Sequence, residues 1–315
     1  MHFLKILQNE HIKIYKKTGT WIIIGILVTL LLGFAMLQKY VLDNGDQSNW
    51  RNQAEARIAQ MEEGMERGPD IEAGREAMGK EIAIQQYRLD NDLPPVAADS
   101  LWGFMIDATN FTAIATLFTI VIAAGIVASE FSTGTIKLLL IRPVRRGKIL
   151  LAKFITTMMF ALFMLILLFG FSYIIGLAFF GSTGSQLPYL TYTGGEVVEK
   201  HMAGHIISLI GFRSIEIIMM ATVAFMISTI FRSSSLAIGF SIFLMFTGPQ
   251  IVQLLSQYDW VKFVLFANTN LMQYVDGTPV VEGMTMSFSI VVLLIYFFVF
   301  LVSSWVIFKQ RDVAV

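Results

Sequence analysis

A long apolar stretch without any charged residue runs from Phe154 to Phe180 and reads FITTMMFALFMLILLFGFSYIIGLAFF. An α-helix rises about 1.5 Å per residue, so about 20 apolar residues cross the roughly 30 Å of hydrocarbon in a bilayer. This stretch is long enough to cross a membrane with some tilt. It is too long and too continuous for a soluble core helix, so it predicts a transmembrane helix.

Other apolar stretches of similar length lie on both sides of this one. The predicted spans are residues 21–38, 111–128, 150–180, 206–231, 236–255 and 287–308. Together they predict an all-α polytopic membrane protein with six transmembrane helices.

The composition agrees with a membrane protein. Hydrophobic residues make up 55% and charged residues 15% of the 315 residues, whereas a soluble domain has about 45–50% and about 25%. This balance excludes a soluble globular enzyme, a disordered chain and a nucleic-acid-binding protein with a basic field. Cysteine is absent, so the chain has no disulfide, no Cys-ligated zinc and no thiol nucleophile.

The net charge is zero, with 23 basic and 23 acidic residues, but the charges are unevenly distributed. Four segments on one side of the predicted membrane contribute +3, +5, +1 and +1, a total of +10. Three segments on the other side contribute −7, −1 and −2, a total of −10. Because Lys and Arg concentrate in cytoplasmic loops, this split predicts that both termini are cytoplasmic.

The segments between the spans follow from this orientation. They are a cytoplasmic amphipathic elbow helix at 1–20, an extracellular helical insert at 39–110, cytoplasmic segments at 129–149 and 309–315, an extracellular loop at 181–205, and an extracellular or re-entrant segment at 256–286.

The N-terminal segment has apolar residues on one side, while Lys5, Lys13 and Lys16 recur at helical spacing. This pattern predicts an amphipathic helix in the inner headgroup layer, with its lysines facing anionic lipid. The alternative is a frayed basic tail.

The insert at 39–110 is rich in charges of both signs and poor in apolar residues. Gly68 and Pro69 divide it into two predicted helices, and Pro94 and Pro95 close it before the chain returns to the membrane. With so few apolar residues available for a core, we expect a helical cap on the membrane face or on a partner.

No catalytic or metal-binding arrangement emerges from the sequence. Gly74 to Lys80 has the spacing of a phosphate-binding loop, but Glu81 replaces the required Ser or Thr and no strand precedes it. His201 and His205 lie four apart, which fits two surface histidines better than a metal site. We therefore expect a chain that is not an enzyme and binds no metal, nucleotide or other cofactor itself.

The most informative segment lies between the second and third spans and reads EFSTGTIKLLLIRPVRR from Glu130 to Arg146. It combines hydroxyl residues that cap helices, a short apolar strip, a proline that ends a helix and a cationic end. Such a segment can dock in a groove of a peripheral protein. Equally, it can be a basic loop that only fixes the membrane topology.

In this position the segment resembles that of the ABC-2 permeases, the membrane subunits of ATP-binding-cassette exporters. The resemblance covers nearly the whole chain, including the basic elbow helix, the large insert after the first span and the short re-entrant helices that the family places before the last span. It implies that the segment contacts an ATPase subunit. The residues to which it assigns this coupling role are Glu130, Gly134, Thr135, Lys137, Arg142, Pro143, Arg145 and Arg146.

The resemblance also implies the partners. The sequence has no nucleotide-binding domain, so ATP and Mg²⁺ are expected on separate ABC ATPase subunits. A second copy of this permease, or a related permease, would complete the exporter in the bacterial plasma membrane.

Arg213 and Glu216 are the only charged residues within the fourth predicted span. They are three residues apart and share a helical face. A charge at mid-membrane costs about 2.5–3.5 kcal/mol on insertion scales, so this pair is not expected to face lipid. It is a candidate for the translocation path or the subunit interface, and the alternative is a structural pair near the outer headgroups.

A function without transport also fits the sequence. In a membrane sensor or scaffold protein, the acidic insert binds a ligand outside and the cytoplasmic arginines bind a signalling partner.

Overall fold

The computed structural model describes residues 3–41, 49–67, 72–135, 145–182, 187–193, 195–231, 233–275 and 279–310. Within these residues, six helices are long and apolar enough to cross a membrane. The protein is an all-α multi-pass membrane protein, as the sequence predicts.

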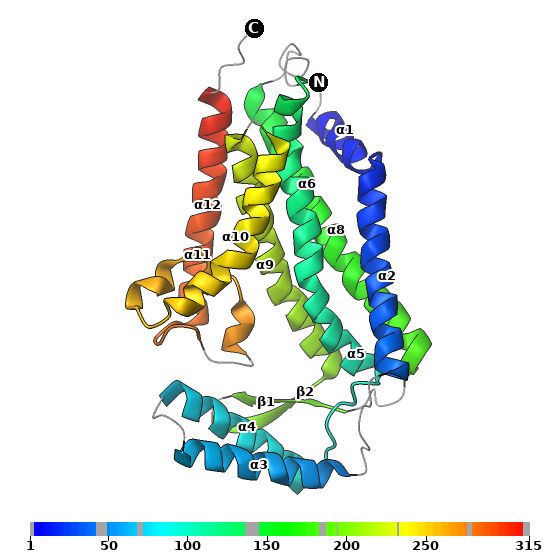
Figure 1. The fold of residues 1–315 in the computed structure, drawn as a ribbon, viewed down its shortest axis with the longest axis vertical. Coiled ribbons are helices and arrows are strands. Elements are labelled where there is room, and N and C mark those ends of the chain that lie inside the picture. The colour runs from blue at the N-terminus through cyan, green and yellow to red at the C-terminus, as the bar shows by residue number, and fades with distance from the viewer. Residues whose placement is uncertain are drawn as a thin grey trace.

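The bundle begins with α1 (Phe3–Tyr15), a short helix that precedes the first span. The spans are α2 (Thr18–Tyr40), α5 with α6 (Leu101–Ala108 and Thr112–Ser132), α8 (Arg146–Phe180), α9 (Met202–Ile230), α10 (Ser234–Leu254) and α12 (Met286–Gln310). Figure 1 shows these helices side by side, with both chain ends at the same end of the bundle.

The second span begins at Leu101 rather than at the predicted residue 111, because the 3₁₀ turn η2 (Thr109–Phe111) joins α5 to α6 without a break. Because Asp107 is charged, the sequence pattern assigns the residues before 111 to the insert and not to the span. The Asp107 carboxylate instead accepts a hydrogen bond from Gln38 Nε2 at 2.9 Å. The charge therefore has a partner on α2 and does not prevent the helix from continuing.

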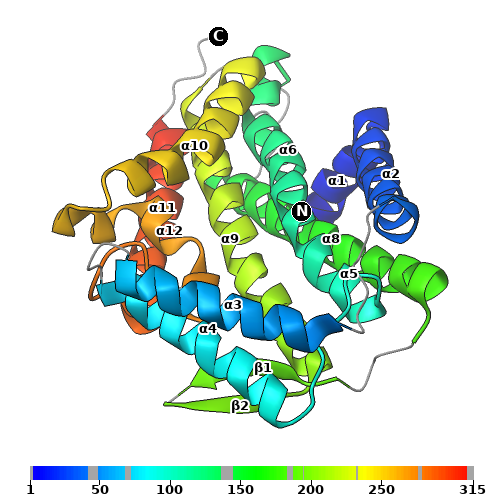
Figure 2. The same cartoon turned by 60° about the horizontal axis from the view of Figure 1, so that its bottom comes forward.

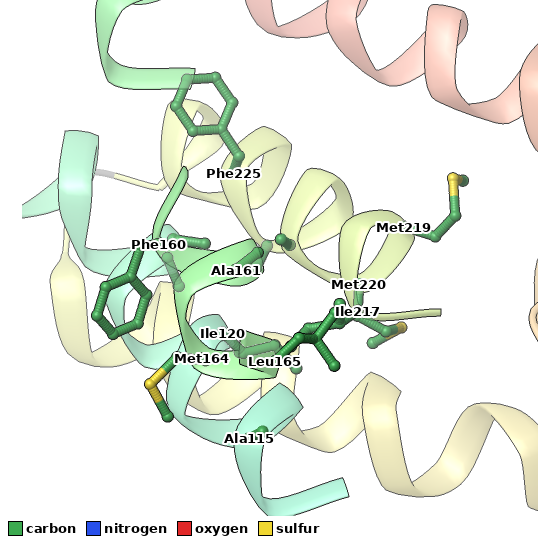
Figure 3. Close-up of a cluster of buried hydrophobic side chains, with 14 of the residues drawn as sticks. Ala115, Ile120, Phe160, Ala161, Met164, Leu165, Ile217, Met219, Met220 and Phe225 are labelled. Atoms are coloured by element: carbon green, nitrogen blue, oxygen red, sulfur yellow. The ribbon is translucent and has the colours of Figure 1, made fainter. Parts of the chain in front are cut away.

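The core of the bundle lies between α6, α8 and α9. Figure 3 shows Ile120 of α6, Leu165 of α8, and Ile217 and Met220 of α9 close together there. Alanines such as Ala115 on α6 and Ala161 on α8 are fully buried, and small residues let transmembrane helices approach closely. By contrast, α2, α10 and α12 leave many large apolar side chains exposed, as expected for faces in contact with lipid or another subunit.

The insert forms two helices, α3 (Trp50–Arg67) and α4 (Glu72–Asp90), as the glycine and proline between them predict. They lie at the end of the molecule opposite the termini (Figure 1), and Figure 2 shows them side by side. An antiparallel hairpin of β1 (Tyr189–Thr193) and β2 (Glu196–Lys200) lies beside α4 at this end. The Tyr87 hydroxyl on α4 donates a hydrogen bond to Glu199 Oε1 at 3.1 Å and thereby links the two parts.

The loop predicted at 181–205 therefore contains a hairpin that the sequence analysis missed. Its signal was present, because two glycines between short runs of β-branched and aromatic residues are typical of a tight hairpin turn. Gly195 has a φ of 95°, a conformation that favours glycine.

The segment between α10 and α12 folds into the short helices η3 (Asp259–Phe263), α11 (Leu265–Asn268) and η4 (Leu271–Tyr274). The Phe266 ring lies so close to Gly248 of α10 that an added Cβ would be 2.5 Å from it. Ser289 of α12 donates a hydrogen bond to Asn268 Oδ1 at 2.6 Å. These contacts fasten the short helices to both neighbouring spans.

Candidate functional site: a buried charge network

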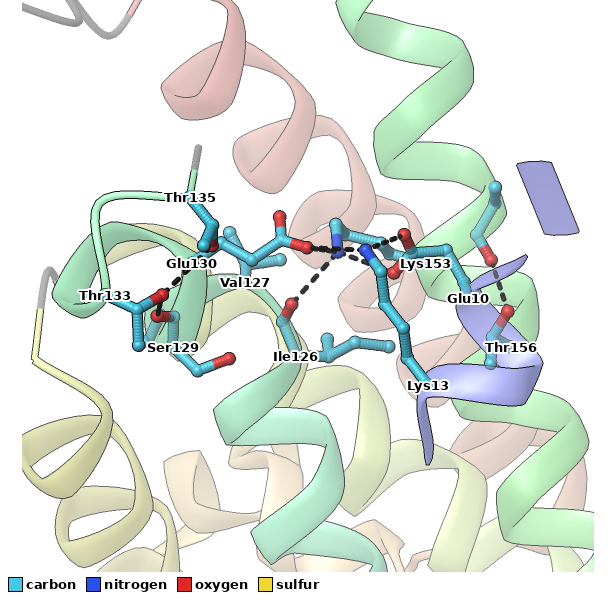
Figure 4. A network of polar contacts seen from close by, with 12 residues as sticks. Glu10, Lys13, Ile126, Val127, Ser129, Glu130, Thr133, Thr135, Lys153 and Thr156 are labelled. Atoms are coloured by element: carbon cyan, nitrogen blue, oxygen red, sulfur yellow. Dashed lines mark hydrogen bonds and ion pairs between the residues drawn. The ribbon is translucent and has the colours of Figure 1, made fainter. Parts of the chain in front are cut away.

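Four charged side chains meet inside the end of the bundle that carries the chain termini. Glu10 and Lys13 come from α1, Glu130 from the last turns of α6 and Lys153 from α8 (Figure 4). We call these four residues the buried charge network. They join three helices that are far apart in sequence.

Lys153 is the centre of the network and is completely buried. Its ammonium group donates to Glu10 Oε2 at 2.6 Å, to Glu130 Oε1 at 2.7 Å and to the backbone oxygen of Ile126 at 3.2 Å. A lysine ammonium has three N–H donors, and here each has an acceptor. Burying a lysine without such partners would be strongly unfavourable.

Lys13 closes the network from its more exposed side. It donates to Glu10 Oε1 at 2.6 Å and to Glu130 Oε1 at 3.1 Å, so each glutamate is shared by both lysines. Within the described part of the chain, the buried Glu130 Oε2 has no hydrogen-bond partner. Two positive and two negative groups thus compensate one another in a small volume.

The two members on α1 show how strongly the groups interact. Burial alone raises the pKa of Glu10, but Lys153 and Lys13 outweigh burial and hold this pKa below its ordinary value. Burial also opposes the charged form of Lys13, yet its bonds to Glu10 and its proximity to Glu130 raise the pKa of Lys13. Both groups are therefore charged at neutral pH.

The end of α6 positions Glu130. Gly134 has a φ of 72°, and its backbone N–H donates to the Phe131 oxygen at 3.2 Å, so this glycine ends the helix one turn after Glu130. Just before Glu130, Ser228 Oγ of α9 accepts hydrogen bonds from the backbone N–H groups of Val127 and Ala128, at 3.1 and 3.0 Å. The last turns of α6 are therefore fixed to α9.

The other predicted coupling residues differ in how the structure places them. Thr135 is exposed immediately after α6, and its hydroxyl lies 3.0 Å from that of Thr133. Arg145 and Arg146 are exposed at the start of α8. Lys137, Arg142 and Pro143 lie outside the described residues.

Most of the network is not apparent from the sequence. No motif singles out Lys153, which lies within α8 and is completely buried. The helix predicted at the N-terminus is confirmed as α1. Its lysines were expected to face lipid, but Lys13 turns inward because Glu10 and Glu130 offer it carboxylates. The sequence does contain one indication of the network. Glu10 is the only acidic residue in the basic segment 1–17, and Glu130 is the only one in the basic segment 129–153.

Arg213 and Glu216 pair with each other on α9. Arg213 Nη1 donates to Glu216 Oε2 at 2.9 Å, and the two side chains are 24% and 28% exposed. Among the described residues, the buried Arg213 Nε has no hydrogen-bond partner. The structure thus brings these two residues together as a pair within one helix.

The remaining motifs do not form sites. Residues Gly74 to Lys80 lie within α4 instead of forming a loop, so their backbone N–H groups cannot cradle a phosphate. The His205 ring stacks on Tyr189 with the ring centres 3.4 Å apart. In the part of the chain that the structure describes, no three metal-ligating side chains cluster.

The chain matches, over residues 81–314, the family described as "Protein of unknown function (DUF2705)". It is 42% identical over 314 residues to "Uncharacterized protein YhcI" of Bacillus subtilis (strain 168), with 99% of each chain covered. It is 35% identical over 216 residues to "Uncharacterized membrane protein YdbK" of the same organism, covering 68% of this chain and 83% of that relative. The chain therefore belongs to the DUF2705 family.

Proposed function

We propose that this chain is the membrane-spanning permease subunit of an ATP-binding-cassette exporter, in which separate ATPase subunits bind and hydrolyse ATP. The observation that carries the proposal is the placement of Glu130. Its carboxylate is buried in a network that joins α1, α6 and α8. The segment that begins at Glu130 and resembles the ABC-2 coupling segment leads from there to the exposed Arg145 and Arg146.

The network gives the proposed coupling a mechanical basis. Removing one member of a buried ion pair costs about 3–5 kcal/mol, so α1 and the adjoining ends of α6 and α8 resist separation. A pull on the segment after Glu130, produced when two ATPases close on ATP, therefore moves all three helix ends together. Substrate would pass between this permease and a second copy or a related permease.

The charge distribution supports a cytoplasmic position for the network. Basic residues such as Lys16, Lys17 and Arg145 lie at the end with the termini. The insert, which has 14 acidic and 7 basic residues over 39–107 and includes α3 and α4, lies at the other end. Because cytoplasmic loops are enriched in Lys and Arg, the proposed orientation places both termini inside the cell. The ATPases would then reach the coupling segment from the cytoplasm.

One observation favours the sensor or scaffold as a second candidate. A cavity of about 280 Å³ lies between α4, β1 and η4 and is lined by Arg88, Tyr189 and Tyr274 among others. Burial lowers the pKa of Arg88, and its buried Nε lacks a partner among the described residues. A small anionic ligand bound there would give the outer module a sensing role.

Co-purification from membranes of the native host separates the two candidates. The tagged chain should retain an ATPase that carries a G-x-x-x-x-G-K-[ST] loop, and its preparation should hydrolyse ATP. The variant Arg145→Glu/Arg146→Glu should insert normally but lose the ATPase. Lys5→Glu, an exposed charge reversal on α1, is the matched control and should retain it. An unmodified chain that retains no such ATPase, or a double variant that still binds it, contradicts the proposal.

A further inference from the structure

Two cavities lie beside the last turn of α1. A cavity of about 550 Å³ lies between α1, the end of α6 and α8. We call it the polar cavity, because nine of its eleven lining residues have a charged or hydroxyl side chain. An apolar groove of about 610 Å³ lies between α1, the start of α2 and α8. Lys16 lines both, so a ligand with one polar and one apolar part can occupy them together.

The polar cavity is positively charged. The titratable side chains that line it are four lysines and two glutamates, a net charge of +2. Lys13 and Lys153 are bound to the glutamates of the buried charge network. The surplus charge therefore belongs to the exposed Lys16 and Lys17, which make no ion pair with any described residue.

Hydroxyl groups complete the lining of this cavity. Ser129, Thr133 and Thr135 line it at the end of α6. Ammonium and hydroxyl groups are the side-chain donors that commonly bind phosphate oxygens. The lining therefore suits a singly charged phosphodiester.

The groove is apolar and borders the first span. Its lining includes Ile12, Tyr15, Trp21, Met159 and Phe163. Trp21 Nε1 donates to the backbone oxygen of Tyr15 at 2.9 Å, which holds the end of α1 against the start of α2. The side chains of Ile12, Trp21 and Met159 are 40%, 60% and 42% exposed, so a hydrocarbon chain can contact them without displacing the core.

We propose that the polar cavity and the groove together bind one anionic phospholipid. Its phosphate contacts Lys16 and Lys17, and an acyl chain lies in the groove along Tyr15 and Phe163. The net charge of +2 selects an anionic over a zwitterionic headgroup. The membrane supplies such a ligand at this depth, because α1 lies where the first span begins. This proposal stands without the proposed transport function, since it involves no ATPase.

Native mass spectrometry of the full-length purified chain tests the headgroup contacts. Phosphatidylglycerol and phosphatidylcholine with identical acyl chains are offered together, and one phosphatidylglycerol should bind in preference. Each lysine near the membrane surface contributes roughly a fivefold factor, so Lys16→Gln/Lys17→Gln should weaken this binding roughly 25-fold. Lys5→Gln is the matched control, because Lys5 is exposed on α1 and lines neither cavity among the described residues.

Two further arms distinguish a lipid from a free anion. Ile12→Trp fills the groove and should weaken phosphatidylglycerol binding, whereas Leu4→Trp, on an exposed part of the same helix, should not. Inorganic phosphate at millimolar concentration should leave the bound lipid in place. Equal binding of both lipids, an equal loss in Lys5→Gln, or displacement by inorganic phosphate would overturn the proposal.

Discussion

The two ends of the molecule hold their charges in opposite ways. At the end with the termini, the Lys153 side chain is 1% exposed and lies 2.6 and 2.7 Å from its two glutamates. At the opposite end, which holds the insert, Arg57 and Glu81 join α3 to α4 at 3.5 Å and are 63% and 35% exposed. The same kinds of ion pair therefore occur in very different surroundings.

This difference decides what the charges do. Exposed pairs contribute about 0–1 kcal/mol because water and salt screen them, so the pairs in the insert mainly keep it soluble. Buried pairs do not by themselves make a protein more stable than apolar residues would, but they are costly to break. The buried charge network therefore fixes how α1, α6 and α8 meet.

The largest effect is expected for Lys153→Met. The change leaves Glu10 and Glu130 buried without their main counter-ion, which should destabilise the protein by about 3–5 kcal/mol. Denaturant unfolding in mixed micelles measures the loss. The triple variant Glu10→Gln/Glu130→Gln/Lys153→Met should recover much of it, because no uncompensated charge remains buried. An unchanged stability of Lys153→Met would show that the network does not hold the helices.

A smaller effect is expected for Ser228→Ala. The backbone N–H groups of Val127 and Ala128 would lose the Ser228 hydroxyl as acceptor, which should cost about 1–3 kcal/mol. Ser208→Ala is the control on the same helix, since among the described residues the exposed Ser208 bonds only to the Gly204 oxygen. The same unfolding measurement applies, and equal losses in the two variants would contradict the assigned role of Ser228.

The network should also make the stability of the protein depend on pH. The pKa of Glu10 is depressed in the folded protein, so its contribution is complete above the ordinary glutamate value of about 4.3 and is lost below it. The pKa of Lys13 is raised, so its contribution is complete below about 10.4 and is lost above it. Stability should therefore stay level between about pH 5 and pH 9.

Glu10→Gln isolates the acid limb of this profile. The difference in unfolding free energy between Glu10→Gln and the unmodified chain should shrink as the pH falls below about 4.3. A difference that grows with acidity has the wrong sign for a depressed pKa and would refute the assignment.

The smallest effect is expected at the end that holds the insert. Arg57→Ala removes an exposed partner of Glu81 and should change stability by less than about 1 kcal/mol. Salt at about 0.5 M should abolish even that difference, because it shortens the screening length below 10 Å. A loss as large as that of Lys153→Met would erase the contrast between the two ends.

The sequence predicted the six spans because apolar length alone determines them. It predicted the helices of the insert because Gly68 and Pro69 separate them in the chain. It did not predict the network, since Glu10, Glu130 and Lys153 are distant in sequence. Glu130 and Lys153 lie at the edges of two apolar stretches, and Glu10 lies within an amphipathic helix. Their burial depends on how α1 packs against α8, which no local pattern encodes.

Glu130 shows in a single residue which features the sequence predicts and which it does not. Its position after the second span and before Gly134 indicated a helix end. Its burial, and the lysines that accompany it, became visible only in three dimensions.

The most direct measurement of the proposed coupling is photo-cross-linking in native cells, with a benzophenone amino acid at the exposed Thr135 and, as control, at Met78 on α4. The proposal predicts an adduct with an ATPase carrying the phosphate-binding loop at Thr135 and none at Met78. An inserted chain that forms no such adduct at Thr135, or forms it equally at Met78, would contradict it.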